Sequence, residues 1–157
     1  MSLDSKRELL RHLLATLAFR GGIAVTNAPD NFAQFRAGEA TRSAGELLAH
    51  IGDLIQGSHF LMKGEFVRLQ SPPQTWAEDV KRFFAEIEKF DSYLVSEAPL
   101  AQPIEKIVQG PIVDALTHVG QIVMLRRLAG KPIQPESYFT AEIAAGGVAE
   151  KYFSKFI

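Results

Sequence analysis

The sequence predicts an all-α protein, and three observations indicate this fold class. Three S/T-x-x-E sequences, typical of helix N-termini, each precede a stretch whose apolar residues recur at spacings of three and four. A fourth, strongly apolar stretch ends at a glycine and a proline, as helices commonly do. Four long helices in 157 residues predict one domain, residues 1–157, built as a four-helix bundle with a long crossover connection and a short C-terminal appendage.

The first helix is expected to begin at a capping box formed by Ser5 and Glu8. Its leucines form one apolar stripe, and the helix is expected to end between Phe19 and Val25. Residues 26–42 then form a long connection that we expect to pack back on the core. A connection of this length suits a crossover between parallel helices.

The second and third helices are expected over residues 44–63 and 76–94. Their capping boxes are Ser43 with Glu46 and Thr75 with Glu78. Two consecutive prolines separate the helices, because such a pair cannot continue a helix. The third helix has the clearest amphipathic pattern. Its predicted solvated face holds Glu78, Asp79, Lys81, Arg82, Glu86, Glu88 and Lys89.

The fourth helical stretch is expected to begin at Ile104 or to restart at Pro111, where proline would take the first helical position. Residues 112–128 are apolar nearly all round, which predicts a central, buried helix. Arg126 is expected to complement the negative end of its dipole. The remaining chain predicts an appendage of short helix or coil. Its apolar pieces lie around Tyr138, Phe139, Ile143, Tyr152 and Phe153.

The composition excludes several classes of function. With 17 basic residues against 18 acidic ones, the chain has no electrostatic signature of nucleic-acid binding, so we expect no nucleic-acid partner. No cysteine is present, and any nucleophile or metal ligand must therefore come from another residue type or from outside the chain. The polar N-terminus and the lack of a long apolar run predict a cytoplasmic protein without a membrane partner.

The four histidines differ in their surroundings. His12 lies among charged residues on the polar side of the first helix, where we expect a solvated side chain. His59 follows His50 by nine residues, about half a turn away around the helix, so the two cannot serve one site. We expect His59 to be partly exposed or to lie at an interface. His50 and His118 each lie along an inward-facing apolar stripe, where a buried imidazole needs a partner.

Asp114 precedes His118 by four residues, one turn away on the same face of an otherwise apolar helix. A carboxylate and an imidazole so placed can bind one cation from one side, and His50 on a facing helix can complete the set. The alternative is purely structural: Asp114 hydrogen-bonds His118 or pairs with an arginine, and His50 bonds a backbone group. Asp53 and Gln121 are candidates for orienting the two imidazoles, although each can equally be a polar neighbour.

Three segments, residues 46–54, 114–121 and 125–132, resemble the DinB/YfiT-like superfamily in content and order, and the H-x-G-Q sequence beginning at His118 is the most specific of these similarities. The resemblance implies a four-helix bundle with a long crossover that often forms homodimers and holds a divalent metal. It assigns His50 and His118 as metal ligands. Asp114 takes the third position, where the family usually has histidine, and its oxygen makes the donor set harder.

Known relatives in this superfamily include thiol-dependent transferases, isomerases and hydrolases. The resemblance therefore implies a metal-dependent thiol transferase or hydrolase acting on a small molecule, with nickel, zinc, iron or manganese not distinguished. Because the chain has no cysteine, a low-molecular-weight thiol would be a cosubstrate. Catalytic residues beyond the metal ligands are not assigned, and no organic cofactor site is evident. The alternative is a non-catalytic, dimeric helical module that binds a small ligand or a partner.

Overall fold

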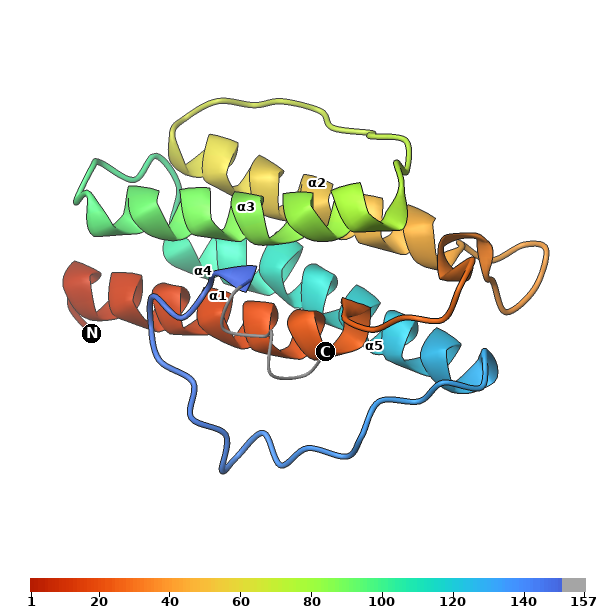
Figure 1. Ribbon diagram of the computed structural model, residues 1–157. Coiled ribbons are helices and arrows are strands. Elements are labelled where there is room, and N and C mark those ends of the chain that lie inside the picture. The colour runs from red at the N-terminus through yellow and green to blue at the C-terminus, as the bar shows by residue number, and fades with distance from the viewer. Residues whose placement is uncertain (151–157) are drawn as a thin grey trace.

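The structure, a computed structural model, describes residues 1–150, and these confirm the all-α prediction (Figure 1). The long helices are α1 (Leu3–Val25), α2 (Ala44–Met62), α3 (Trp76–Val95) and α5 (Val113–Leu128). The short ones are the 3₁₀ helix η1 (Phe32–Gln34), α4 (Ile104–Ile107) and the π-helical segment η2 (Val108–Ile112). Because η2 follows α4 and leads directly into α5, the fourth helix of the bundle is one continuous helical stretch.

The helix directions place the crossover at a different connection from the one expected. The Arg82 guanidinium of α3 donates to the Ala49 carbonyl near the start of α2, and the Tyr93 hydroxyl lies against the Met62 carbonyl at its end. The two helices are therefore parallel, and residues 63–75 run along the bundle to join them (Figure 1). Residues 26–43 join α1 and α2, which run in opposite directions. The prediction that they connect parallel helices is wrong.

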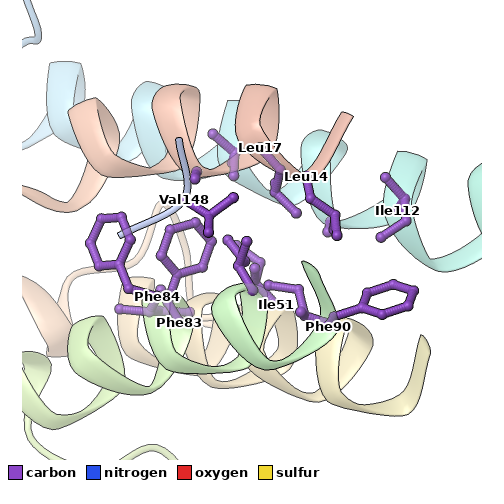
Figure 2. Packing of buried hydrophobic residues seen from close by; sticks show 14 of the residues in the cluster. Leu14, Leu17, Ile51, Phe83, Phe84, Phe90, Ile112 and Val148 are labelled. Carbon is purple, nitrogen blue, oxygen red and sulfur yellow. The ribbon is translucent and has the colours of Figure 1, made fainter. Parts of the chain in front are cut away.

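The core lies between the four long helices and is also covered by the C-terminal segment. Figure 2 shows side chains from each part meeting in the interior: Leu14 and Leu17 from α1, Ile51 from α2, Phe83, Phe84 and Phe90 from α3, Ile112 from η2, and Val148. α1 and α3 approach closely at Gly21, where a β-carbon would collide with the Phe83 ring. The expected packing of the first connection on the core is confirmed by Phe32, which is buried.

Two of the three predicted capping boxes are confirmed, at the starts of α2 and α3. The box at Ser5 and Glu8 is wrong, because α1 begins earlier, at Leu3. Ser2 is its N-cap and accepts a hydrogen bond from the Ser5 backbone N–H at 3.1 Å. Ser5 and Glu8 therefore lie inside the helix, where the Glu8 carboxylate pairs with Arg11 at 2.8 Å. α1 ends at Val25, within the expected range.

The charged face of α3 is less solvated than predicted. Asp79 and Glu86 are buried, and Arg82 is half-buried. Asp79 accepts a hydrogen bond from the Gln74 backbone N–H just before the helix starts, and burial raises the pKa of its carboxyl. A helical pattern shows that a charged residue lies off the apolar stripe. It does not show which connection later covers that residue.

The fourth helix is peripheral, in contrast to the predicted central position. One side of α5 packs on the core, whereas Val113, Met124 and Leu128 are about half exposed on the other side. Composition alone could not distinguish a helix buried all round from one with an unpaired apolar face. Within residues 1–150, no helix has the length and apolar character needed to cross a membrane.

Arg126 lies in the last turn of α5 with Arg127, as predicted, and also contacts a neighbouring helix. Its guanidinium is buried and donates to the carbonyl oxygens of Ala24 in the last turn of α1 and of Thr26 and Asn27 just after it. The guanidinium therefore supplies hydrogen bonds to carbonyl oxygens at the end of a neighbouring helix. Burial lowers its pKa. The spacing that suggested an interaction with its own helix dipole could not reveal a contact with a segment about 100 residues away.

The C-terminal segment confirms the expected appendage over residues 129–150, where the backbone forms turns and coil until a 3₁₀ residue at its end. The Tyr138 ring packs edge-on against Phe19 and lies under the Arg20 guanidinium, 4.1 Å from it. Val148 is buried, whereas Phe139 is almost fully exposed. The apolar residues expected at Tyr152 and Phe153 lie outside the described residues.

Candidate metal centre

Three predicted site residues converge where α2 and α5 face each other. His50 comes from the middle of α2, and Asp114 and His118 come from successive turns of α5. One side-chain ligand atom from each lies within 4.8 Å of the other two. His118 Nε2 is 3.4 Å from Asp114 Oδ1, and His50 Nε2 is 3.8 Å from Asp114 Oδ2. The sequence-based prediction that these three side chains lie together therefore agrees with the structure.

The π-helical segment η2 sets the direction in which Asp114 and His118 project. The Val113 backbone N–H donates to the Val108 carbonyl five residues earlier, which is the bond of a π turn. The additional residue in this turn rotates everything after it by about 100° around the axis relative to an uninterrupted α-helix. Pro111, inside the segment, is better explained by this π turn than by the predicted restart. Such segments frequently occur at functional sites.

Gln121 fixes the orientation of the His118 ring. Its side-chain oxygen lies 2.7 Å from His118 Nδ1. Because an amide oxygen only accepts, Nδ1 carries a proton and donates to Gln121, which leaves Nε2 on the side of Asp114. This is the arrangement in which a metal-binding histidine is held by an outer partner. The interpretation of Gln121 as an orienting residue is supported, and its i+3 spacing was the signal that identified it.

His50 has the electronic character of a ligand. Burial lowers the pKa of its imidazole, the nearby Arg42 charge and His118 lower it further, and the negative charge of Asp114 partly opposes them. At neutral pH the ring is therefore neutral and keeps a lone pair for bonding. The His50 and His118 rings meet edge to face, with centroids 4.9 Å apart.

The purely structural alternative lacks the contacts that it requires. The distances from Asp114 to the two imidazoles exceed those of ordinary hydrogen bonds. Asp114 pairs with no arginine in the described part of the chain, and His50 donates to no backbone group there. No hydrogen bond within the described residues therefore uses the atoms that these three side chains turn toward one another.

Three other polar candidates take no part in the cluster. Asp53 does not orient His50, because its carboxylate binds the Arg82 guanidinium at 2.6 Å and the Ser71 backbone N–H at 2.8 Å. His12 is exposed on α1, as expected. His59 is half-buried and packs against the Phe90 ring, with centroids 5.7 Å apart, in agreement with its predicted exclusion from the site.

A cavity of about 640 Å³ opens beside the three converging side chains. Its walls are Ala37, Thr41 and Arg42 from the first connection, Leu47 and His50 from α2, and Asp114, His118, Gln121, Met124 and Leu125 from α5. Sequence reasoning missed the contribution of the first connection, because no periodicity indicates where a loop residue lies. The volume is in the range of small-molecule sites, and the walls combine apolar side chains with a few polar ones.

The donor set fits a divalent transition metal. Two imidazole nitrogens and one carboxylate oxygen are ligands that zinc, iron, manganese and nickel accept, and three protein ligands leave further coordination positions open. The neutral His50, the oriented His118 and the acidic Asp114 supply lone pairs to one region beside a cavity.

A scan of protein-family models, a search of curated proteins and a search of solved structures each found no match.

Proposed function

We propose that this protein is a divalent-metal-dependent enzyme of the DinB-like type, a thiol-dependent transferase or a hydrolase. His50, Asp114 and His118 would be its metal ligands. One observation carries the proposal: three side chains with the right donor atoms converge at a cavity, and no hydrogen bond within residues 1–150 joins their facing atoms to the protein. The resemblance in the segments around these residues supports the same interpretation.

The residues of the chain would bind and orient, and the cavity would receive the substrate. Gln121 keeps the proton of His118 on Nδ1, so that Nε2 faces the site. When bound, a divalent ion supplies Lewis acidity that makes a thiol or a water molecule nucleophilic near neutral pH. Since the chain has no cysteine, the thiol in a transferase reaction is a low-molecular-weight cosubstrate that enters the cavity beside the substrate.

The exposed side of α5 supports the proposal of a homodimer. Val113, Met124 and Leu128 follow one another at helical spacings, and each is about half exposed. Between them lies Gly120, whose surroundings are open, so a second helix could approach the backbone closely there. Sedimentation of the purified protein tests this part: a dimer that Leu128→Lys converts to a monomer supports it, and a wild-type monomer refutes it.

Thermal melting with added metal tests the metal proposal. An ion that binds the native chain raises the melting midpoint with its concentration, so Ni²⁺, Zn²⁺, Fe²⁺ and Mn²⁺ are each added to protein stripped with a chelator. We expect at least one ion to raise the midpoint of the wild type. His118→Ala should remove this shift. His12→Ala, which changes an exposed histidine on α1, is the matched control and should preserve it.

The same experiment distinguishes the enzyme from a non-catalytic binding module. No shift with any of the four ions would contradict the metal-dependent enzyme and favour the module. Where a shift occurs, the protein carrying that ion is assayed with a panel of thiols and electrophiles and with ester and amide substrates. Turnover that His50→Ala abolishes supports the enzyme, and metal binding without any turnover favours the module.

A further inference from the structure

Arg42 lies on the wall of the cavity beside His50, Asp114 and His118, and it is unpartnered within the part of the chain that the structure describes. The other basic residue of this turn, Arg36, is held by Glu46 at 3.4 Å and by the Thr41 carbonyl at 2.9 Å. Arg42 is exposed and has no hydrogen bond or ion pair with any other residue between 1 and 150. It lines the same cavity as His50, Asp114 and His118, so it lies beside the candidate ligands. A free guanidinium beside such a cavity is a ready site for an anionic group.

The turn that carries Arg42 is braced. Thr41 makes both a backbone and a side-chain hydrogen bond to the Gly38 carbonyl, and its hydroxyl accepts from the Gly38 N–H. On the other side, Ser43 is fixed in the capping box of α2. The backbone on both sides of Arg42 is therefore held before any ligand arrives, which lowers the entropic cost of binding.

The rest of the cavity is suited to the apolar part of a ligand. Leu47, Met124 and Leu125 line it, and Met124 is flexible enough to adapt to different shapes. A second groove, of about 540 Å³, lies on the other side of Asp114 between Gly57 and Pro111, and no basic side chain lines it. Of these two hollows beside Asp114, only the first combines the triad with a positive charge and an apolar wall.

We propose that the substrate of this site is a small organic acid, and that Arg42 binds its carboxylate or phosphate group while its apolar part lies against Leu47, Met124 and Leu125. This inference rests on the proposed function for the identity of the reacting centre. Arg42 is a specificity-determining residue here, since an uncharged molecule of the same shape would gain nothing from it. The guanidinium can hold either oxyanion through two parallel N–H donors.

Ligand-observed NMR titration of three matched probes tests the proposal: hexanoate, hexyl phosphate and hexanol. Each is titrated into wild type, Arg42→Gln and Arg68→Gln, both after chelator treatment and with added Zn²⁺. Arg68 is a matched control because it is an exposed arginine in the connection 63–75, away from the cavity. Because Arg42 is exposed and bonds to none of the described residues, we expect Arg42→Gln to melt at the wild-type temperature.

We expect wild type to bind at least one acid more tightly than hexanol, and Arg42→Gln to weaken that acid about tenfold without changing hexanol. Arg68→Gln should behave as wild type. Whichever acid binds more tightly identifies the oxyanion, carboxylate or phosphate. Equal binding of the acids by wild type and Arg42→Gln in both metal states, or no acid binding by wild type in either, would overturn the proposal.

The design separates this inference from the metal proposal. If none of Ni²⁺, Zn²⁺, Fe²⁺ and Mn²⁺ binds but the chelator-treated protein still loses acid affinity in Arg42→Gln, the metal proposal fails and the anion site stands. If Zn²⁺ binds and Arg42→Gln has no effect on the acids in either state, the anion site fails and the metal proposal stands. His118→Ala, which should lose the metal, is expected to retain the Arg42-dependent part of acid binding.

Discussion

Two polar clusters lie one turn apart on α2, and they use their polar atoms differently. In the first, Asp53 binds Arg82 and the Ser71 backbone N–H, and Arg82 also donates to the Ala49 carbonyl and to Gln56. In the second, the Asp114 carboxylate lies 3.4 Å from His118 Nε2 and 3.8 Å from His50 Nε2, without a hydrogen bond to either. The first cluster is complete within the protein. The second leaves lone pairs directed at one region.

The surroundings of the two clusters agree with this difference between a hydrogen-bonded cluster and one whose facing atoms have no hydrogen bond. Gly52 has no side chain, and a β-carbon there would come within 3.0 Å of an Arg82 nitrogen, so the guanidinium can lie directly on the α2 backbone. Asp53 is only 7% exposed, whereas the Asp114 side chain is 49% exposed and borders the cavity. A completed, buried cluster is expected to stabilise the fold, and an incomplete one beside a cavity is expected to bind something.

Removing Asp53 should have the largest effect on stability. Asp53→Ala leaves the guanidinium of Arg82 partly buried without its carboxylate, and loss of one partner of a buried ion pair costs about 3 kcal/mol. Urea denaturation of chelator-treated protein measures this loss. Asp114→Asn is the matched control and should stay within about 0.5 kcal/mol of wild type, because that side chain is half exposed. If the two variants lost similar stability, the proposed division between the clusters would be wrong.

Removing Gln121 should weaken metal binding without removing a ligand. Gln121→Ala frees the His118 ring to rotate and change tautomer, and loss of such an outer partner typically costs about 10- to 100-fold in metal affinity. Competition with a chromophoric chelator measures the affinity. Gln121→Glu, whose carboxylate can also accept from Nδ1, should restore most of it. A Gln121→Ala variant with unchanged affinity would show that His118 is held by some other contact.

The pH dependence of the unfolding free energy should show a smaller difference between the Asp53 cluster and the Asp114 cluster. Burial acts to raise the pKa of Asp53, but the hydrogen bonds from Ser71 and Arg82 outweigh it and lower the pKa below its ordinary value. A carboxyl whose pKa is lowered by folding adds stability above its unfolded pKa of about 3.9. This stability is lost as pH falls through the lower folded value.

The difference in unfolding free energy between wild type and Asp53→Asn should therefore be constant from pH 7 to about 5 and shrink below about pH 4. Urea denaturation at a series of pH values measures it, with Asp114→Asn as the reference variant. A difference that stayed constant down to pH 3, or that grew there, would contradict the lowered pKa of Asp53.

Features that depend on residues a few positions apart in the chain could be predicted from the sequence. The capping boxes at Ser43 and Thr75 and the helix-period apolar residues follow from contacts within a few positions, so α2 and α3 lie close to their expected bounds. The pairing of Asp114 with His118 is also local, since helical geometry alone places them one turn apart. That His50 would face them follows from its place on the apolar stripe of α2.

Features that depend on distant segments were not predictable in this way. The direction of each helix, and hence the crossover at residues 63–75, is set by packing among all four helices. Asp53 finds Arg82 on another helix, and Arg126 finds carbonyls about 100 residues away. Arg42 enters the cavity from a connection without periodicity. In each case the partner of the residue depends on how distant segments pack, and the local sequence pattern does not contain that information.

X-ray absorption spectroscopy of the metal-bound protein tests the central claim most directly. The account predicts one bound divalent ion per chain, with scattering from two imidazoles and from oxygen ligands, and a reduction to one imidazole in His118→Ala if that variant retains metal. His12→Ala should give the wild-type spectrum. A wild-type spectrum without imidazole scattering, or one that His118→Ala leaves unchanged, would contradict the assignment of His50, Asp114 and His118 as the metal centre.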